Sequence, residues 1–456
     1  MNPGELTIAG AGLCGSLLGI LLRRRGHRVT ILERRSDPRT STDEGGRSIN
    51  LALSARGIRA LQAAGIFSQA ERLLMPMRGR LIHYEDGKTE LLPYGQRNEE
   101  QIYSVSRAAL NRLLIDAADY GQQSAVRFRQ DVSGFDRGRH ELRVVDLDQD
   151  RHWSSQTLPV IAADGAGSAI RRSLQQGSAI EVTESLLPHG YKELSIPPAA
   201  DGRPQLDPQA LHIWPRGQFM LIALPNPGGD FTLTLFMPNE GPDSFAVLDG
   251  AAATEAFFSN NFPDLVPLIP GLVRAFLNNP VGILGTVRCG QWHDGGELLL
   301  IGDAAHAIVP FHGQGMNLAF EDCLLLDRIL RDATSWHGAF AAFQSQQMDN
   351  ANAIADMALE NYVEMRDTVR DEKFKLRKAL SFQLERCLPG RFIPRYSMVM
   401  FHDEIPYAVA KRRGALQEAL LQELTLTAHS IEDIDLERAA CLVRERLPPL
   451  DSDLQH

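Results

Sequence analysis

The chain has 456 residues, of which 44% are hydrophobic, and carries a formal net charge of −10 with a pI near 5.7. This length exceeds what one hydrophobic core usually supports, so two or three domains are expected. The acidic balance argues against nucleic acid as a partner. The five cysteines are odd in number and form no CxxC pair, which indicates free thiols in a reducing cytoplasm rather than a disulfide scaffold or a zinc site.

The first predicted element is a strand, a tight glycine turn and a helix. An apolar run leads into residues 10–15, Gly-Ala-Gly-Leu-Cys-Gly, and leucine and isoleucine then line one helix face. Such glycines let the backbone approach a pyrophosphate at the helix N-terminus, where unpaired N–H groups favour negative charge. Glu33 closes the next strand, 28–32, at the spacing where an acidic side chain accepts hydrogen bonds from a ribose. The candidate dinucleotide-binding residues of this region are Gly10, Gly12, Leu13, Cys14, Gly15, Glu33 and Arg34.

Glycine turns of this kind also serve packing alone, but two later motifs favour a flavin. Ala163-Asp164-Gly165 lies in the middle of the chain, and an apolar strand over 298–301 ends at Gly302 and Asp303. A glycine turn then precedes a helix over 316–330. This pattern predicts a carboxylate for ribityl hydroxyls, or for a helix cap, and a helix end facing the pyrimidine edge of an isoalloxazine. FAD fits better than NAD, and the candidate residues are Asp164, Gly302, Asp303, Pro310, Gly313, Gln314, Gly315, Met316 and Asn317.

The rest of the chain changes character twice. Residues 186–285 are predicted to be β-rich, with strands at 211–214, 219–224 and 231–236 that form one wall of a pocket. Beyond about 340 the chain is predicted to be helical, first over 339–388 and again after Gly414. The predicted fold class is α/β: a Rossmann-like FAD-binding domain with a β-sheet substrate domain and a helical C-terminal region. The predicted boundaries are 1–75, 100–185 and 286–340 for the FAD-binding domain, 76–99 and 186–285 for the β-rich domain, and 341–456 for the helical region.

The combined layout resembles the group A flavin-dependent aromatic hydroxylases. Eight further segments lie at 46–54, 77–80, 93–95, 189–194, 211–215, 309–317, 360–365 and 391–398. Within that group, these segments resemble the kynurenine 3-monooxygenase family. Ala162 departs from that pattern, because the middle motif of the family often has glycine there. Arg107 resembles the family arginine that reaches the flavin from a helix over 107–118. The chain has no second GxGxxG, as expected for a group that binds NAD(P)H only transiently.

The resemblance implies an enzyme that hydroxylates L-kynurenine to 3-hydroxykynurenine in tryptophan degradation, with NADPH and O2 as co-substrates. In such an enzyme a flavin C4a-hydroperoxide attacks the ring. The flavin carries the chemistry, so no catalytic side chain and no metal ligand are assigned. Because the aniline nitrogen already directs electrons to the ortho carbon, no strong protein base is required. The implied substrate-binding residues are Arg80, Tyr94, Leu211, Met220, Ile222, Phe236, Pro310, Phe311, His312, Asn361 and Tyr396.

Alternatives remain open at this stage. By residue pattern alone Arg80 reads as an ordinary ion-pair residue, and the apolar strand residues read as core. Another anthranilate-like arene, or flavin binding without turnover, is compatible with the same motifs. Membrane-bound relatives carry a C-terminal anchor, whereas residues 451–456 are polar, so a soluble bacterial-type, cytoplasmic form is expected. The choice between NADPH and NADH and the oligomeric state are left open.

Overall fold

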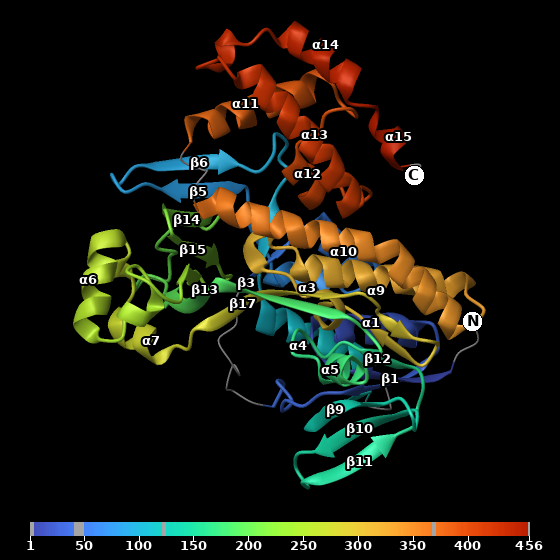
Figure 1. Cartoon of the computed structure of the whole chain (residues 1–456). Coiled ribbons are helices and arrows are strands. Elements are labelled where there is room, and N and C mark those ends of the chain that lie inside the picture. The colour runs from blue at the N-terminus through green and yellow to red at the C-terminus, as the bar shows by residue number, and fades with distance from the viewer. Residues whose placement is uncertain (1–3, 41–49, 121–124, 367–370, 455–456) are drawn as a thin grey trace. The chain divides into compact units, whose positions relative to one another are not determined.

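The computed structural model describes residues 4–40, 50–120, 125–366 and 371–454, so segment 46–49 of the family resemblance and the last two residues lie outside the described part. The chain divides into two compact units that are interleaved along the sequence (Figure 1). The first unit comprises Met1–Leu74, Val105–Leu186 and Gly285–Ala355. The second comprises Met75–Ser104, Leu187–Leu284 and Asp356–His456. Each is described by itself.

A six-stranded sheet forms the centre of the first unit. Its order is β18-β19-β12-β1-β2-β8, and all neighbouring pairs except β18 with β19 are parallel. Ala9 at the end of β1 lies opposite Ala162 in β12, which lies opposite Leu300 in β19. The three motifs therefore begin at the same carboxyl edge, where ligands bind in open α/β sheets. The strands are β1 (Glu5–Ala9), β2 (Arg28–Leu32), β8 (Val126–Arg127), β12 (Val160–Ala162), β18 (His293–Asp294) and β19 (Leu298–Leu300).

Helices cover this sheet as the sequence predicts. Helix α1 (Leu13–Arg24) packs against α4 (Arg107–Ala118) and against α9 (Gly315–Asp332), and α9 also packs against α2 (Ala55–Ala63). The apolar residues of α1 from 17 to 22 are all buried, as their spacing indicates. The first strand, its helix, the strand over 28–32 and the helix over 107–118 are confirmed.

The first unit also contains a three-stranded antiparallel sheet that the sequence analysis does not predict. It consists of β9 (Gln130–Asp136), β10 (Glu141–Asp146) and β11 (Arg151–Ser155), and Figure 1 shows it as a separate twisted layer. Short polar turns join its strands, and α5 (Ala169–Gln176) packs against β9. Few of its residues are fully buried, and none in β11, so the sequence has only a weak alternation of apolar and polar residues here.

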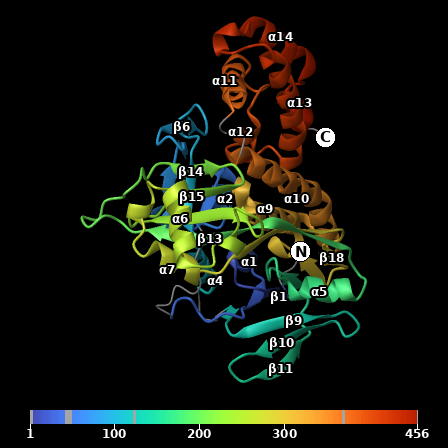
Figure 2. The same ribbon diagram turned by 60° about the vertical axis from the view of Figure 1, so that its left-hand side comes forward.

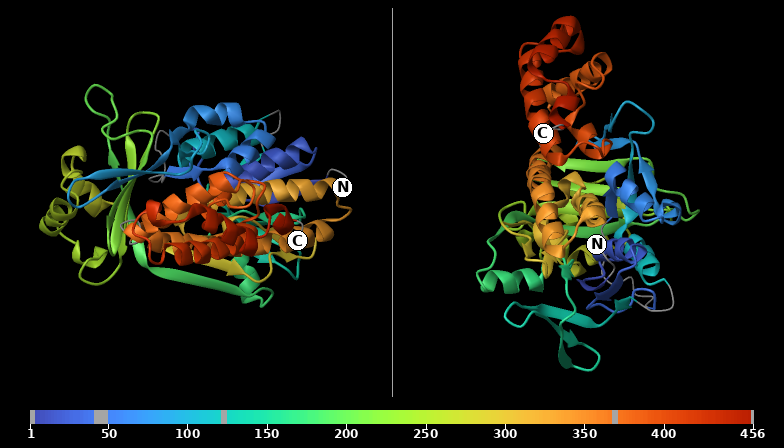
Figure 3. Two further views of the ribbon diagram at one scale, coloured as in Figure 1. Left: turned by 90° about the horizontal axis from the view of Figure 1, so that it is seen from above. Right: turned by 90° about the vertical axis from the view of Figure 1, so that its right-hand side faces the viewer.

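A seven-stranded sheet in the order β17-β13-β16-β15-β14-β5-β6 forms the second unit's β-layer. Alternate residues of its strands, such as Leu221, Leu233 and Leu235, join one buried cluster with Phe258 and Phe276. Those phenylalanines come from α6 (Ala251–Asn261) and α7 (Leu272–Asn278), which lie on one side of these strands in Figures 2 and 3. The strands are β5 (Gly79–His83), β6 (Thr89–Pro93), β13 (Val182–Ile196), β14 (Leu211–Arg216), β15 (Phe219–Pro225), β16 (Phe231–Pro238) and β17 (Gly282–Cys289).

The prediction of a β-rich segment over 186–285 is therefore correct up to Pro238 and again from Gly282, where β17 begins, but wrong for the residues of α6 and α7. A short additional strand, β4 (Met75–Met77), pairs with β7 (Ile102–Ser106). The predicted architecture of a Rossmann-like domain, a β-sheet region and a helical C-terminal region is confirmed.

The C-terminal helices share a second buried cluster. Leu376, Leu380 and Leu384 of α11 pack with Leu420 of α13 and Val443 of α14, and these three helices lie together in Figure 1. The helices are α10 (Trp336–Arg366), α11 (Glu372–Cys387), α12 (Arg395–Met400), α13 (Tyr407–Thr425), α14 (Leu436–Arg446) and α15 (Leu450–Leu454). None of the helices in the described part of the chain is both long enough and apolar enough to cross a bilayer.

Gly414 does not mark the start of a helical region, contrary to the sequence-based expectation, because α13 begins at Tyr407 and continues through it. A Cβ at Gly414 would collide with the side chain of Arg395 in α12. The glycine thus serves close packing between two helices, and sequence alone does not separate that use from a helix boundary.

Candidate functional site

The first glycine turn has one position that is open and two that are closely packed. Gly10 has φ +97°, and a Cβ there would lie 2.5 Å from the carbonyl oxygen of Ala163, while a Cβ at Gly15 would collide with the carbonyl of Gly10. A Cβ at Gly12 would meet no atom within 4 Å. Gly12 is the N-cap of α1, so the open space beside it leaves the backbone N–H groups at the start of α1 available to a pyrophosphate. Leu13 and Cys14 follow as the first helical residues.

Glu33 is buried and ties the end of β2 to this turn. Its carboxylate accepts the N–H of Ala11 at 2.9 Å and both the N–H and the Nε of Arg35, at 2.9 and 2.8 Å. Burial favours the neutral acid, but the hydrogen bonds and charge of Arg35 outweigh it and lower the pKa of Glu33. The neighbouring Arg34 is exposed. Arg35 is a contact that the sequence analysis missed, and the ribose-binding role of Glu33 stays a prediction.

Asp164 follows β12 at the same edge. Its Oδ2 accepts the N–H groups of Ala169 and Ile170, at 2.9 and 3.3 Å, at the start of α5. Its Oδ1 is buried and has no hydrogen-bond partner among the described residues. A buried carboxylate oxygen without a partner is costly, so this atom fits a site completed by a polar ligand. Ala162 is the last residue of β12, where a Cβ is accommodated within the strand.

The third motif forms a sharp turn after β19. Gly302 has φ 60° and ψ −143° and is the N-cap of α8 (Asp303–His306), so the alternative prediction that Asp303 caps this helix is wrong. Burial raises the pKa of Asp303, and the positive charge of Arg107 at the start of α4 opposes this rise. The carboxylate of Asp303 and the exposed guanidinium of Arg107 therefore act on each other electrostatically in this unit.

The segment before α9 combines a glycine turn with a buried amide. Gly313 has φ 69°, and Gln314 is the N-cap of α9, which begins at Gly315. Asn317 donates to the carbonyls of Ala52 and Gly313, at 2.8 and 2.9 Å, and accepts the N–H of Ser54 at 3.0 Å. Its side chain thus stabilises the turn itself, and a direct role toward the cofactor stays a prediction.

The other predicted residues of this segment lie in and around a short 3₁₀ helix. Phe311 and His312 are each 6% exposed, Pro310 is exposed and Met316 is buried. They belong to the first unit, whereas the remaining predicted substrate-binding residues belong to the second.

Four of those remaining residues form one cluster. Arg80 of β5 is 6% exposed, and its guanidinium carbon lies 5.0 Å from the ring centre of Tyr396 and 6.0 Å from that of Tyr94. The two tyrosine rings stack at 5.3 Å with an interplanar angle of 10°. Nη2 of Arg80 donates to Oδ1 of Asn361 at 3.4 Å. Residues far apart in the sequence therefore meet around one buried cation.

The sequence analysis missed two charged members of this cluster. Nη1 of Arg80 donates to Oε1 of Glu364 at 3.0 Å, and Glu364 lies one helical turn after Asn361 in α10. Burial and the charge of Arg80 lower the pKa of Lys378 in α11 to about 8. The spacing of Asn361 and Glu364, which places them on one helix face, could have indicated Glu364. No local pattern indicates Lys378.

The tyrosines of the cluster keep their protons. Burial raises the pKa of both Tyr94 and Tyr396, so each hydroxyl remains a donor near neutral pH. Within the described residues, no hydrogen bond of normal geometry satisfies the buried hydroxyl of Tyr94. Two cations and two phenols suit a carboxylate, and the oxygens of Glu364 and Asn361 suit an ammonium group.

The predicted apolar wall lies on the same sheet face as Arg80. Arg80 pairs with Leu211, and Met220 pairs with Phe236. Directly paired residues point to the same side of a sheet, and successive residues along a strand point to opposite sides. Leu211, Met220, Ile222 and Phe236 thus occupy the face opposite the large buried cluster of α6 and α7. They are not members of that cluster, as expected for pocket-lining residues.

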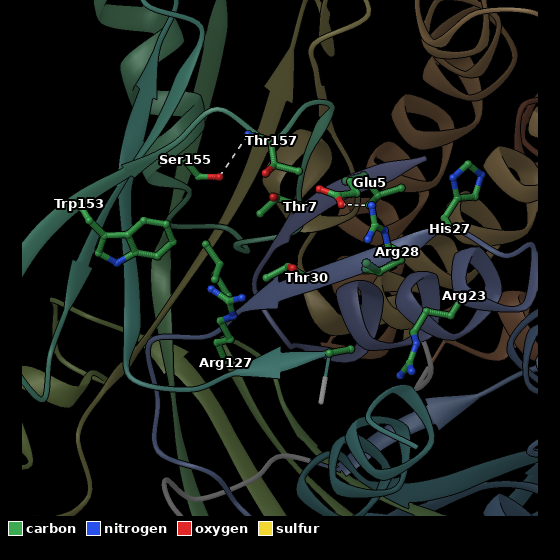
Figure 4. Close-up of a pocket in the computed structure, with 14 residues that line it drawn as sticks. Glu5, Thr7, Arg23, His27, Arg28, Thr30, Arg127, Trp153, Ser155 and Thr157 are labelled. Carbon is green, nitrogen blue, oxygen red and sulfur yellow. Dashed lines mark hydrogen bonds and ion pairs between the residues drawn. The ribbon is translucent and has the colours of Figure 1, made fainter. Parts of the chain in front are cut away.

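A separate polar hollow of about 410 Å³ lies along one face of the six-stranded sheet (Figure 4). Thr7 and Thr30 project into it from β1 and β2, and Trp153 and Ser155 of β11 lie across from them (Figure 4). None of the residues of the glycine turns lines it. Its hydroxyl-rich lining differs from the apolar wall predicted for an aromatic ring, so it is distinct from both clusters above.

The chain is similar to known proteins over almost its whole length. A family model described as FAD binding domain matches residues 5–215 and 284–341. A kynurenine 3-monooxygenase of Myxococcus xanthus is 48% identical over 97% of this chain and 96% of that protein. A kynurenine 3-monooxygenase of Stenotrophomonas maltophilia is 46% identical over 98% of both chains.

Solved structures support the same fold at lower identity. The tetrameric form of 2-methyl-3-hydroxypyridine-5-carboxylic acid oxygenase has a TM-score of 0.65 at 17% identity, over 80% of this chain and 94% of that one. PqsL of Pseudomonas aeruginosa, in complex with 2-aminobenzoylacetate, has a TM-score of 0.63 at 22% identity, over 81% and 98%.

Proposed function

The chain belongs to the kynurenine 3-monooxygenase family of flavin-dependent aromatic monooxygenases, and we propose that it converts L-kynurenine to 3-hydroxykynurenine with NADPH and O2. One atom of O2 is inserted into the ring C–H bond ortho to the amine and the other leaves as water, while NADPH and one proton are consumed and NADP⁺ is formed. The single observation that carries this choice of substrate is the cluster around Arg80, whose charges complement an amino-acid group.

The first unit offers a site that fits FAD. The open space at Gly12 fits a pyrophosphate, and the unpartnered Oδ1 of Asp164 fits a buried polar ligand. Glu33 and Asp303 would accept hydrogen bonds from hydroxyl groups of the dinucleotide, and Arg107 would add a positive charge beside Asp303. Bound FAD supplies the electron storage and oxygen activation that no protein side chain provides.

The second unit would bind the amino-acid part of the substrate. Arg80 would hold the carboxylate through its planar fork, with Tyr94 and Tyr396 donating from their hydroxyls. Glu364 and Asn361 would accept from the ammonium group. The aromatic ring would lie on the apolar face that contains Leu211, Met220, Ile222 and Phe236. The substrate-binding roles of Pro310, Phe311 and His312, which belong to the first unit, stay predictions.

The test is an aerobic NADPH oxidation assay with and without L-kynurenine, with mass analysis of the product. We expect kynurenine to accelerate NADPH oxidation and to leave one oxygen atom heavier, hydroxylated ortho to the amine. If oxidation accelerates but all oxygen ends as hydrogen peroxide, kynurenine is only an effector and another arene is the substrate. If no aryl amino acid accelerates oxidation, flavin binding without turnover becomes the better explanation. A parallel series with NADH decides the nicotinamide preference.

The proposed cellular location is the cytoplasm. All five cysteines are free thiols, and no disulfide joins Cys14 and Cys323 although their sulfur atoms are only 3.7 Å apart. Free thiols at this distance are compatible with a reducing compartment.

A further inference from the structure

A fully buried carboxylate lies directly behind the Gly302 turn. Asp322 of α9 is 0% exposed, and its Oδ2 accepts the N–H of Gly302 at 2.9 Å and faces Nε2 of His306 at 2.7 Å. Its Oδ1 accepts from Nε2 of Gln347 in α10 at 2.8 Å. One side chain therefore joins the turn after β19, the end of α8 and two long helices, all within the first unit.

The backbone at Gly302 needs such an acceptor. With φ 60° and ψ −143°, Gly302 has a conformation that side-chain-bearing residues rarely adopt. Its N–H is buried, and a buried donor without a partner is destabilising. The carboxylate of Asp322 satisfies this N–H and so fixes the direction in which the next residue, Asp303, leaves the strand.

His306 supplies the countercharge. It is 5% exposed and packs against Trp292 with ring centres 4.9 Å apart. Burial lowers the pKa of His306, but the charge and hydrogen bond of Asp322 outweigh this effect and raise it above the ordinary value. Asp303 raises it further.

Other titratable groups lie near this pair. Arg107 faces Asp303, and both Cys14 and Glu321 interact with the charge of Asp322. Cys14 also interacts with Cys323. The hydrogen bond with Cys323, together with burial, raises the pKa of the Cys14 thiol well above its ordinary value. Burial raises the pKa of Glu321, although Arg56 opposes this. His306 is therefore the group whose protonation completes the ion pair with Asp322.

We propose that Asp322 and His306 are positioning residues for FAD: as an ion pair they hold the Gly302 turn in the conformation that presents Asp303 to the cofactor. The inference deepens the proposed function and rests on FAD binding at this edge of the sheet. Neither side chain needs to touch the reacting atoms. Loss of the pair would leave the strand and the helices in place but let the turn relax.

The experiment compares Asp322→Asn with the matched control Asp327→Asn. Both remove one carboxylate from α9, but Asp327 pairs with Arg25 and does not contact the turn. The FAD dissociation constant of the apo-protein is measured between pH 6 and 9 by flavin fluorescence, together with the melting temperature of the apo-protein. At pH 6 we expect Asp322→Asn to raise the FAD dissociation constant by about tenfold, as for the loss of one hydrogen bond to a charged group, and Asp327→Asn to leave it near that of the wild type.

The pH profile separates positioning from general stability. Because the pKa of His306 is raised in the folded protein, the ion pair is complete below pH 6.5 and is lost as the pH rises through the raised pKa. Wild-type FAD affinity should therefore fall toward pH 9, whereas Asp322→Asn should have a flatter profile. His306→Gln, which retains a side-chain donor but does not titrate, should be flat as well, and it serves if Asp322→Asn does not fold.

Two outcomes would overturn the inference. One is a wild-type pH profile in Asp322→Asn and His306→Gln. The other is an equal loss of FAD affinity in the Asp322 and Asp327 variants that follows their loss of melting temperature. A wild-type protein that binds no FAD would contradict the proposed function instead, so the two failures are distinguishable.

Discussion

Replacing Arg80 by alanine should weaken kynurenine binding while leaving the flavin content unchanged. A guanidinium that grips a carboxylate with two charge-assisted hydrogen bonds contributes about 3 kcal/mol, at about 1.5 kcal/mol for each bond. Part of this is offset, because Arg80 already donates to Glu364 at 3.0 Å and must share its charge. We therefore expect the kynurenine dissociation constant to rise by about 30–100-fold, since about 1.4 kcal/mol corresponds to a factor of ten.

The assay is titration of the FAD-loaded protein with L-kynurenine, followed by the flavin absorbance change. Arg80→Lys should recover only part of the affinity, because an ammonium keeps the charge but loses the planar fork. Arg80→Ala also leaves Glu364 without its cation, so the double variant with Glu364→Gln should recover melting temperature but not kynurenine affinity. A decarboxylated kynurenine should bind the wild type poorly and be indifferent to the change. If the acid and this analogue lose affinity equally in Arg80→Ala, Arg80 is structural and the proposed substrate orientation is wrong.

Three further outcomes are expected. Gly12→Ala should lower FAD retention with little change in the melting temperature of the apo-protein. Gly15→Ala should also lower that melting temperature, because its Cβ would collide with the backbone of Gly10. Equal melting temperatures of the two apo-proteins would contradict this difference. Lys378→Met should raise the melting temperature at pH 7, because the wild type must bury a charged ammonium group. This gain should shrink as the pH rises from about 8 to 10.5, where wild-type Lys378 has lost its proton in the folded chain but keeps it in the unfolded chain. A gain that does not depend on pH would refute this prediction. Leu380→Ala, fully buried in the C-terminal cluster, should lower the free energy of unfolding by about 2–5 kcal/mol in urea titrations, and a loss below 1 kcal/mol would show that this cluster does not stabilise the fold.

The sequence predicts the first unit well where the pattern is local. The turn at Gly10 to Gly15, the strand ending before Glu33 and the helix starting at Arg107 each depend on residues adjacent in the chain. The common carboxyl edge of the three motifs follows from parallel pairing, which the apolar strands indicate.

Features that depend on distant partners were not predictable. Lys378 has an ordinary helical context, and its pKa is lowered only by its burial and by the charge of Arg80 in the folded unit. Asp322 reads as a polar residue in an amphipathic helix until β19 places Gly302 against it. The functional division of the chain into domains, and the roles of the individual site residues, stay predictions.

The interleaving of the two units has a consequence for protein synthesis. Strand β12 ends at Ala162, but its neighbour β19 begins only at Leu298, and the intervening chain takes roughly 7–27 s to make at about 5–20 residues per second. During this interval the nascent chain has one unpaired edge along Val160–Ala162, residues that are completely buried once β19 is in place. Unpaired apolar edges recruit other strands, so a ribosome stalled before Leu298 would release a chain prone to aggregation. Slow codons within residues 163–297 should therefore lower the yield of active protein more than slow codons near either end of the chain. A shortage of chaperones while these residues are synthesised should have the same effect.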